Sequence, residues 1–402
     1  MEIYLDNAAT TRVYPQAAET VLKVMREDYG NPSSLHMKGV DAEKYLRDSR
    51  ETLARLLKVE QKEIVFTSGG SESNNMAIVG SVLANKRLGR HVITTRIEHP
   101  SVYNPMEFLR EEGYEVTYLP VDEYGLVRLD ALKKALRPDT CLVSVMAVNN
   151  EIGTIEPLED IAGIVRQTNP HTLIHVDAIQ AFGKMKIYPS RLGIDLMSAS
   201  GHKFHGPKGT GFLWIKSGTK VHPLILGGGQ QKGMRSGTEN VPGYAGMGSA
   251  ARLEFDHLDE KIDRLYELRE YFIENVLKIE GTHLNGGRYR GSFSMSQEGM
   301  AGHCAAPHIV NISFEDIRAE VLLHALEEKE IYVSSGSACS SNHPQLSGTL
   351  KAIGVPRALL DSSLRFSFSY DTDKDQIDMC LQALGELLPV LRRYTPGGRK
   401  RR

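Results

Sequence analysis

Three segments of the sequence combine residue types that bind phosphate, carry negative charge and form covalent bonds. The first is SGGSES at 68–73, which follows an apolar segment and opens a helical pattern. Gly69 and Gly70 allow a sharp turn that exposes backbone N–H groups at the start of the helix, and Ser71 adds a hydroxyl. The pattern indicates a phosphate-binding turn, but it is neither a Walker loop nor GxGxxG, and a purely structural turn is the alternative.

The second segment, HVDAIQ at 175–180, supplies an acid. Asp177 ends an apolar run that reads as a strand, and α/β proteins bind their ligands at the ends of such strands. A carboxylate at this place can face a cationic ring nitrogen. The alternative is that Asp177 is a helix cap or a turn residue.

The third segment, SASGHKFHGPKGTG at 198–211, supplies an amine. Lys203 stands between a strand end and a glycine-rich stretch, which suits a desolvated amine that forms a Schiff base. Ser200 and His202 can both donate to a phosphate. An ordinary surface lysine is the alternative for Lys203.

The order of these features in the chain is more specific than any one of them. Pyridoxal phosphate needs a lysine for its aldehyde, an acid for its ring nitrogen, donors for its phosphate and a flat side chain against its ring. His99, in RIEHPSV, follows another predicted strand and can supply the flat partner, although a structural histidine is the alternative. The set predicts a pyridoxal-phosphate-binding protein.

Seven short apolar segments are the elements that must position these residues. Their near-continuous apolar character predicts strands buried on both faces, and helical patterns occur at 41–57, 72–85 and 158–168. This alternation predicts an α/β fold with a mostly parallel, mixed sheet. The predicted strands are 63–68, 91–97, 115–121, 141–148, 172–178, 195–200 and 209–216.

The pattern changes after about residue 255, and we predict a domain boundary near 258. We expect a large cofactor-binding domain at 14–258, and a smaller α+β domain formed by 1–13 and 259–402. The smaller domain is expected to carry a mobile loop at about 333–348. The other elements predicted there are helices at 257–280, 317–329 and 373–393, a strand at 308–314 and an exposed loop at 286–307.

The composition excludes several classes of protein. A chain of 402 residues has room for about two or three domains. Its 48 basic and 50 acidic residues give a net charge of −2, which argues against a dedicated nucleic-acid-binding protein. No apolar run approaches the ~20 residues of a membrane span, and the N-terminus lacks a signal-peptide pattern, so we expect a cytoplasmic protein.

The four cysteines lie far apart and form no CxxC pair. We therefore expect thiols rather than a zinc ribbon or a disulfide framework. Cys141 and Cys380 lie in apolar patterns and are predicted core residues. Cys304 and Cys339 lie in polar or Gly/Ser-rich surroundings and are the candidates for chemistry.

Nine segments, in this order, give the chain a resemblance to the cysteine desulfurases of the NifS/IscS type, which are class V aminotransferase-fold enzymes. The segments span nearly the whole chain, and SSGSAC is the diagnostic one. They are YLDNAATT (4–11), YGNPSSLH (29–36), FTSGGSESNN (66–75), EHPSV (98–102), NNEIGTIEP (149–157), HVDAIQ (175–180), SGHKFHGPKGTG (200–211), GGGQQKGMRSGTEN (227–240) and SSGSACSS (334–341).

This resemblance implies a type I fold of pyridoxal-phosphate-dependent transferases, with pyridoxal phosphate as cofactor. Lys203 resembles the Schiff-base lysine, Asp177 the partner of the pyridine nitrogen and Gln180 the donor to the ring hydroxyl. His99 resembles the residue that stacks on the ring, and Asn150 resembles a further cofactor- or substrate-side contact. The implied phosphate ligands are Gly70, Ser71, Ser200 and His202.

The resemblance also implies a substrate, L-cysteine, and a route for its sulfur. Arg365 resembles the arginine that grips the substrate carboxylate, with Asn31 assisting. Cys339 resembles the cysteine that takes the sulfur as a persulfide while alanine leaves, and His99 is expected to move a proton to or from the sulfur. Thr238 resembles a residue that reaches the phosphate of the other subunit, which implies a homodimer.

The acceptor of the sulfur stays open. An iron–sulfur scaffold and a tRNA-thiolating enzyme are the leading classes, and thiamine sulfur carriers are a third. Other class V activities, such as an aminotransferase, a kynureninase-like hydrolase or a selenocysteine lyase, would keep Lys203 and Asp177 without a persulfide on Cys339. A non-catalytic scaffold that binds sulfur-transfer partners is the alternative from another class.

The chain departs from the family pattern at three places. Ser71 stands where threonine is usual, which keeps the hydroxyl. After LRFS, the family usually continues with Leu-Gly-Arg, whereas this chain has Phe368, Ser369 and Tyr370. The missing arginine indicates a different active-site entrance or partner-binding surface, but it leaves in place the arginine that binds the substrate carboxylate. The loop at 286–307 looks longer than usual. Its end brings together His303, Cys304 and His308, but the spacing is a weak signal and we predict no metal site.

Overall fold

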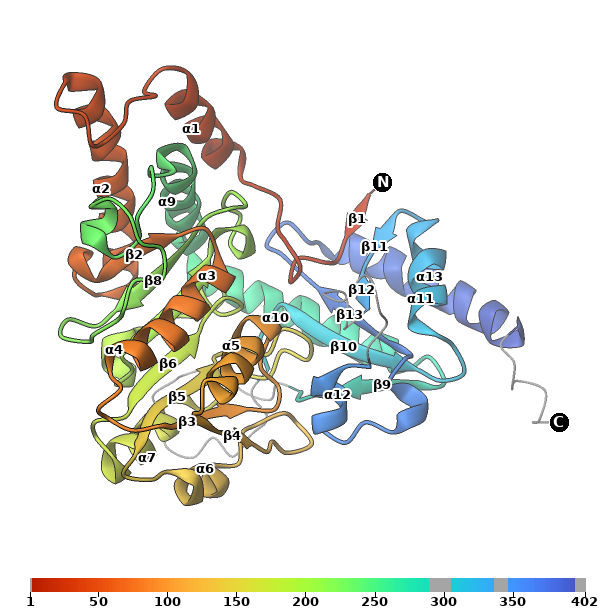
Figure 1. Ribbon diagram of the computed structural model, residues 1–402. Coiled ribbons are helices and arrows are strands. Elements are labelled where there is room, and N and C mark those ends of the chain that lie inside the picture. The colour runs from red at the N-terminus through yellow and green to blue at the C-terminus, as the bar shows by residue number, and fades with distance from the viewer. Residues whose placement is uncertain (1, 289–304, 336–345, 395–402) are drawn as a thin grey trace.

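The computed structural model describes residues 2–288, 305–335 and 346–394. Its largest element is a seven-stranded sheet in the order β2-β8-β7-β6-β5-β3-β4 (Figure 1). The strands run parallel except β8, which is antiparallel to both β2 and β7. Their bounds are β2 Ile64–Thr67, β3 His91–Thr95, β4 Glu115–Leu119, β5 Thr140–Met146, β6 Leu173–Asp177, β7 Leu196–Ser200 and β8 Gly211–Ile215. Each overlaps a predicted strand, so the predicted α/β fold with a mostly parallel sheet is confirmed.

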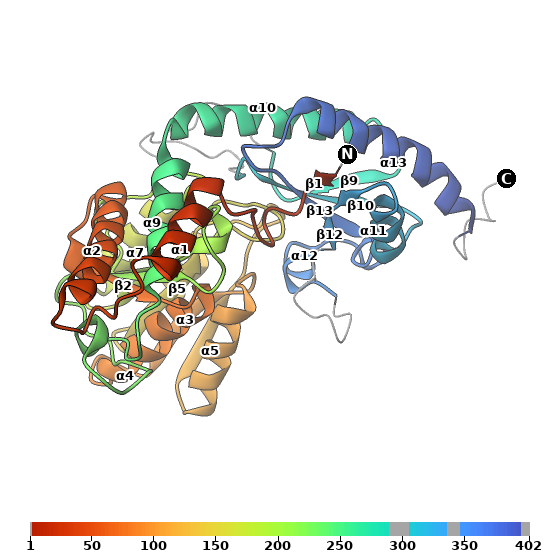
Figure 2. The same ribbon diagram turned by 90° about the horizontal axis from the view of Figure 1, so that it is seen from above.

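Helices cover both faces of this sheet, so every residue of β2, β3, β5, β7 and β8 is buried, whereas the edge strand β4 is mostly half-buried. Neighbouring residues of one strand pack into different clusters: Val92 faces the cluster that contains α5, and Ile93 faces the cluster that contains α2 and α9. Figure 2 shows α3, α4 and α5 on one side of the sheet and α1, α2, α7 and α9 on the other. These helices are α1 Pro15–Arg26, α2 Met37–Leu57, α3 Gly70–Asn75, α4 Ser81–Ala84, α5 Pro100–Glu111, α6 Leu129–Ala135, α7 Leu158–Thr168 and α9 Val241–Phe255. We call the sheet with these helices the large unit.

A four-stranded antiparallel sheet in the order β12-β13-β10-β9 forms the centre of a small unit. Its hydrophobic core includes Phe272, Phe314 and Phe366, and it also takes in Ile3 and Leu5 from the N-terminal segment. The elements are β9 Thr282–Asn285, β10 Ile309–Phe314, β11 Ile331–Tyr332, β12 Ser334–Ser335, β13 Ser363–Ser367, α10 Leu258–Val276, α11 Ala319–Glu327, α12 Gly348–Ala352 and α13 Lys374–Tyr394. Ile3 and Leu5 pack in the core of the small unit, whereas Ala8 and Val13 pack with the core of the large unit. The predicted domains, 14–258 and 1–13 with 259–402, stay a prediction.

The N-terminal segment joins the two units. Its strand β1, Ile3–Tyr4, pairs in parallel with β11 in the small unit. The chain then passes between the units toward α1 (Figures 1 and 2). On the way, Asn7 Nδ2 donates to Ser367 O at 3.0 Å, and Ala8 N donates to Ser367 Oγ at 2.8 Å.

Tyr370 makes a second contact between the units. Its hydroxyl donates to the carbonyl of Gly183 at 2.6 Å. The ammonium of Lys184 lies 4.7 Å from the ring centroid, that of Lys261 lies 5.2 Å from it, and Lys184 also pairs with the buried Glu254. Where the family usually has an arginine, this chain therefore has an aromatic residue that packs between two lysines.

Two loop predictions need correction. The loop predicted at 286–307 is not exposed at its end: Ala305 and Ala306 are buried, because Tyr266 donates to Ala305 O and Ala306 N donates to Gly153 O. The loop predicted at 333–348 is shorter, since its two ends belong to β12 and to the start of α12. Residues 289–304 and 336–345, with Cys304 and Cys339, lie outside the described residues.

The helix predicted at 72–85 begins two residues earlier and is not uniform. It comprises α3, a π-helical turn at Met76–Gly80, and α4. In the part of the chain that the structure describes, no helix has the length and apolar character needed to cross a membrane.

Candidate active site

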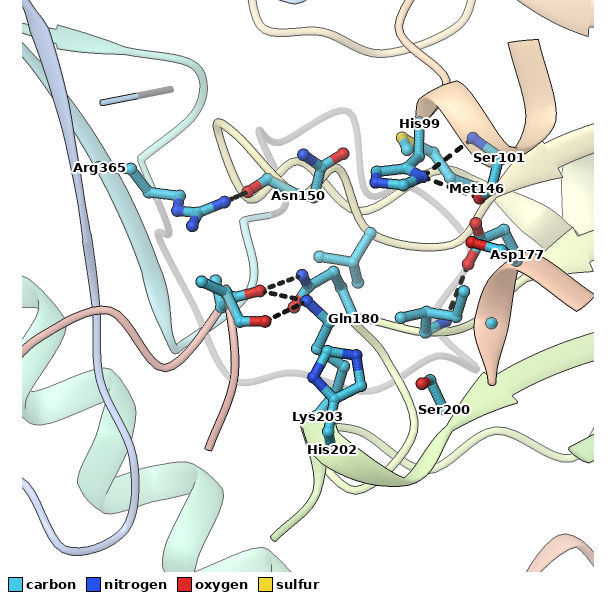
Figure 3. A pocket seen from close by; sticks show the side chains of 16 residues that line it. His99, Ser101, Met146, Asn150, Asp177, Gln180, Ser200, His202, Lys203 and Arg365 are labelled. Atoms are coloured by element: carbon cyan, nitrogen blue, oxygen red, sulfur yellow. Dashed lines mark hydrogen bonds between the residues drawn. The ribbon is translucent and has the colours of Figure 1, made fainter. Parts of the chain in front are cut away.

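A cavity of about 340 Å³ lies at the carboxyl ends of β5, β6 and β7, where the small unit and the N-terminal segment meet the large unit. Figure 3 shows side chains from these elements pointing into it. It brings together ten of the residues predicted from the sequence, which are Gly70, Ser71, His99, Asn150, Asp177, Gln180, Ser200, His202, Lys203 and Arg365. Asn31 and Thr238 do not line it and are exposed, and Cys339 lies outside the described residues.

Asp177 is a buried carboxylate held by two N–H donors. The side chain is 4% exposed at the end of β6. Its Oδ1 accepts from Ile179 N at 2.9 Å, and its Oδ2 accepts from Asn74 Nδ2 at 2.8 Å. Burial raises the pKa of Asp177, whereas the Ile179 N–H, the nearby His99, the Asn74 amide and Lys203 lower it. A cation in the cavity would further favour the ionised carboxylate.

Lys203 reaches across the cavity to the N-terminal segment. Its Nζ donates to Ala8 O at 2.7 Å and to Ala9 O at 2.8 Å. Gln180 Nε2 donates to the same Ala8 carbonyl at 2.9 Å, so the amide and the amine lie side by side. Lys203 is the last residue of a tight 3-10 turn, Gly201–Lys203, which follows β7 directly.

The turn before α3 leaves open space at one end of the cavity. Gly69 has a φ of 152°, a conformation that residues with a side chain rarely adopt. A Cβ on Gly70 would overlap Cδ1 of Ile179, so only glycine fits there without movement. A second cavity of about 420 Å³ adjoins this end and shares Gly70 and Ser71 with the first.

The second cavity shows two residues that the sequence reasoning did not single out, Thr10 and Lys208. Thr10 Oγ1 lies 3.2 Å from His202 Nδ1. Burial, together with the charges of Lys203 and Lys208, lowers the pKa of His202 to about 4. His202 is therefore neutral near pH 7, and Lys208, which lines the second cavity, supplies the positive charge that a phosphate requires.

Arg365 enters the cavity from β13 of the small unit. Its Nη2 forms an ion pair with Asp6 Oδ1 at 2.9 Å, and its Nη1 donates to the carbonyl of Asn150 at 2.8 Å. Arg365 is only 6% exposed, and its Nε is buried without a hydrogen-bond partner among the described residues. Burial raises the pKa of Asp6, and the guanidinium opposes that shift. The two contacts fix the plane of the guanidinium, which suits a group that binds a carboxylate.

His99 closes the cavity on the side of α5. As the N-cap of that helix, it accepts from Ser101 N through Nδ1 at 3.1 Å, and Ser101 Oγ lies 2.8 Å from the same nitrogen. Burial lowers the pKa of His99, although the nearby Asp177 raises it. Asp6, Asn74 and Ser101 were not singled out from the sequence, although all three lie within segments that carry the family resemblance.

These residues fit pyridoxal phosphate. The flat His99 ring and the buried Asp177 lie in one cavity with the Lys203 amine. The glycine turn and the second cavity lie at one end, where Lys208 adds positive charge. An aldehyde, a cationic ring nitrogen and a phosphate on one small molecule would match these three features.

The Aminotransferase class-V family model matches residues 3–380 of the chain. The chain belongs to the aminotransferase class-V family. "Cysteine desulfurase IscS" of Dictyoglomus turgidum is 43% identical over 396 residues, which are 98% of this chain and 96% of that protein. Enzymes of this family depend on pyridoxal phosphate.

Solved structures of class V members have the same fold. A "NIFS-LIKE PROTEIN" superimposes with a TM-score of 0.88 at 37% identity, covering 97% of this chain and all of the other. A structure described as "SspA in complex with cysteine" superimposes with a TM-score of 0.77 at 33% identity, covering 92% of this chain and 99% of the other. Membership of the family and the fold inferred from the resemblance are thereby confirmed.

Proposed function

We propose that this protein is a pyridoxal-phosphate-dependent cysteine desulfurase, which converts L-cysteine to L-alanine and passes the sulfur on through Cys339. The observation that carries the proposal is that Lys203, Asp177 and Arg365 line one cavity. A reactive amine, a buried acid and a carboxylate-binding cation are the groups that an amino-acid-transforming enzyme with this cofactor needs. The relatives named as cysteine desulfurases, and the structure described with bound cysteine, support the choice of substrate.

When bound, the cofactor supplies an electron sink that weakens bonds at the substrate Cα and Cβ. The chain's own residues would bind the cofactor and the substrate and orient them. Lys203 would hold the cofactor covalently and, once released, act as the base at Cα. Asp177 would keep the ring nitrogen protonated, and Arg365 would hold the substrate carboxylate at the side of the small unit. Gln180, Asn150 and His99 would contact the ring and the substrate.

Chain length supports the role that we propose for Cys339. Strand β12 pairs with β13 so that Ser334 lies opposite Arg365, at the edge of the cavity. Cys339 follows Ser335 by four residues, and four extended residues span up to roughly 14 Å. We propose that its thiolate attacks the substrate sulfur: the S–S bond forms as the Cβ–S bond breaks, and the carbon takes up a proton to leave as alanine.

We propose that the protein acts as a homodimer. Asn31 and Thr238 do not line the cavity, but Pro32 and Ser33 line another surface cavity together with Gln231 and Glu239. Large apolar side chains are exposed on the adjoining segment, among them Tyr29, Leu35 and Met37. Exposed apolar clusters on soluble proteins commonly mark interfaces. A second copy covering this face would bring Thr238 toward the partner's phosphate end.

The sulfur acceptor is proposed to be another protein, an iron–sulfur scaffold or a tRNA-thiolating enzyme. We propose a cytoplasmic location and no direct contact with nucleic acid or membrane. These proposals rest on the resemblance and on the near-neutral charge of the chain.

The test is the release of alanine and sulfide from L-cysteine, with dithiothreitol as the sulfur acceptor. The wild type is expected to turn over, Lys203→Ala to lose turnover and the covalent cofactor band, and Lys208→Ala to keep the covalent link. Transamination or hydrolysis of another amino acid, without alanine production from cysteine, would replace the proposal with a different class V activity. Failure to bind pyridoxal phosphate would instead indicate a non-catalytic scaffold that binds sulfur-transfer partners.

A further inference from the structure

A chain of hydrogen bonds links His99 to Asp177 through two residues without a predicted role. His99 Nδ1 lies 2.8 Å from Ser101 Oγ, and that oxygen lies 2.9 Å from Asn74 Nδ2. The same Nδ2 lies 2.8 Å from Asp177 Oδ2. Ser101 is 9% exposed and Asn74 is fully buried, so the Asn74 NH₂ group and Ser101 Oγ take their hydrogen-bond partners from the protein, whereas Asn74 Oδ1 is buried without a partner among the described residues.

The direction of these bonds follows from the acid at one end. An ionised carboxylate only accepts hydrogen bonds, so Asn74 must turn its NH₂ group toward Asp177. The second N–H of that group then donates to Ser101 Oγ. Because Ser101 Oγ accepts from Asn74, its own proton is available for His99 Nδ1.

The backbone imposes the same direction from the other end. Ser101 N donates to His99 Nδ1 at 3.1 Å, and a backbone amide has no way to act as an acceptor. This bond satisfies one of the N–H groups that the first turn of α5 leaves without a helical partner. Nδ1 of His99 therefore faces two donors and must present its lone pair, which leaves Nε2 as the protonated nitrogen of the neutral ring.

We propose that Ser101 and Asn74 are positioning residues that hold His99 as the neutral Nε2–H tautomer, so that His99 serves as a fixed hydrogen-bond donor in the candidate active site. The consequence for catalysis rests on the proposed function: the N–H would stabilise negative charge on the substrate sulfur without transferring its proton. Shuttling a proton, as expected from the sequence, would require an imidazolium whose Nδ1–H points at the Ser101 N–H.

The groups around His99 agree with a neutral ring. Burial lowers the pKa of His99, the charges of Lys203 and Arg365 lower it further, and Asp177 alone acts in the opposite direction. Glu98, the preceding residue, is half-buried, and burial of its carboxyl holds the pKa of that group well above the usual range. This shift disfavours a negative charge on Glu98 beside the imidazole.

The tautomer is measured by ¹⁵N NMR on full-length, cofactor-loaded protein labelled in the histidine rings. The His99 signals are identified by their loss in His99→Gln. The wild type is expected to show Nε2–H with unprotonated Nδ1 from mildly acidic to mildly alkaline pH. In Ser101→Ala one of the two donors to Nδ1 is removed, so the imidazolium should appear at a higher pH than in the wild type, and Ser101→Thr should restore the wild-type profile.

A matched control is Ser144→Ala. It removes a Ser Oγ contact of the same length, 2.8 Å, to Nδ1 of His175, which does not line the cavity. This variant should leave the His99 signals unchanged. An Nδ1–H tautomer or an imidazolium at neutral pH in the wild type overturns the proposal, as does an unchanged His99 profile in Ser101→Ala. An Nε2–H signal in a protein that does not desulfurate cysteine would support the tautomer and refute the proposed function separately.

Discussion

Two of the four cysteines have surroundings that keep them out of sulfur chemistry. Burial raises the pKa of Cys141 to about 11 and that of Cys380 to about 12. Because the thiolate is the nucleophile, both are inert near neutral pH, as expected of core residues. Cys304 and Cys339 are the remaining candidates, and the family motif singles out Cys339.

The first prediction concerns that thiol. Cys339→Ser should bind cofactor and respond spectrally to cysteine, but lose at least about 100-fold in alanine production, because a hydroxyl is a poor nucleophile toward sulfur. Cys304→Ser should stay within a few-fold of the wild type, as should Cys141→Ala apart from lost stability. The measurement is steady-state alanine formation by each variant. Loss of activity in Cys304→Ser would instead identify Cys304, in the 286–307 loop, as the nucleophile.

Asp6 gives the second prediction at this scale. Its ion pair with Arg365 orients the guanidinium, so Asp6→Asn should raise KM for cysteine by roughly tenfold, about 1.4 kcal/mol, and change kcat much less. Arg365→Lys should have the larger effect on KM, since it removes the bidentate geometry. Steady-state kinetics separates the two constants. A fall in kcat alone for Asp6→Asn would mean that Asp6 does not act through substrate binding.

At the scale of elements, the turn between β2 and α3 is the most constrained part of the site. Gly70→Ala would force its Cβ against Cδ1 of Ile179, so the end of that side chain must shift within the cavity that it lines, and cofactor binding should weaken. The double variant Gly70→Ala/Ile179→Ala should recover part of that affinity. Gly163→Ala in α7 is the control, because nothing surrounds the added methyl. Fluorescence titration with pyridoxal phosphate measures the affinity of each variant. Wild-type affinity in Gly70→Ala would show that this turn does not bind the phosphate.

The sequence predicts elements better than it predicts the contacts between them. Short apolar runs predicted all seven large-unit strands; for the six strands other than the half-buried edge strand β4, burial on both faces leaves a strong local signal. The partners of the predicted site residues left no such signal: Asn74 meets Asp177 across 103 positions, and Asp6 meets Arg365 across 359. Such pairings depend on strand order and on how the units pack, which local periodicity does not contain.

At the scale of the whole molecule, the homodimer leads to a prediction about cofactor retention. If Thr238 reaches the partner's phosphate, Thr238→Ala should raise the dissociation constant for pyridoxal phosphate about tenfold, and dilution to monomers should release it. Thr168→Ala, another exposed threonine, is the control. Sedimentation with absorbance detection at the cofactor band follows both effects. A monomer that keeps its cofactor fully would exclude this role for Thr238.

The N-terminal segment has a consequence for how the protein is made. Residues 3–9 supply a strand of the small unit, a carboxylate for Arg365 and two carbonyls for Lys203, yet their small-unit partners lie beyond residue 330. During translation the large-unit sheet can form early, whereas the cavity stays incomplete until β13 has left the ribosome. Insertion of the cofactor is therefore expected to be a late, post-translational event. Nascent chains truncated before residue 363 should fold the large-unit sheet but should not retain pyridoxal phosphate.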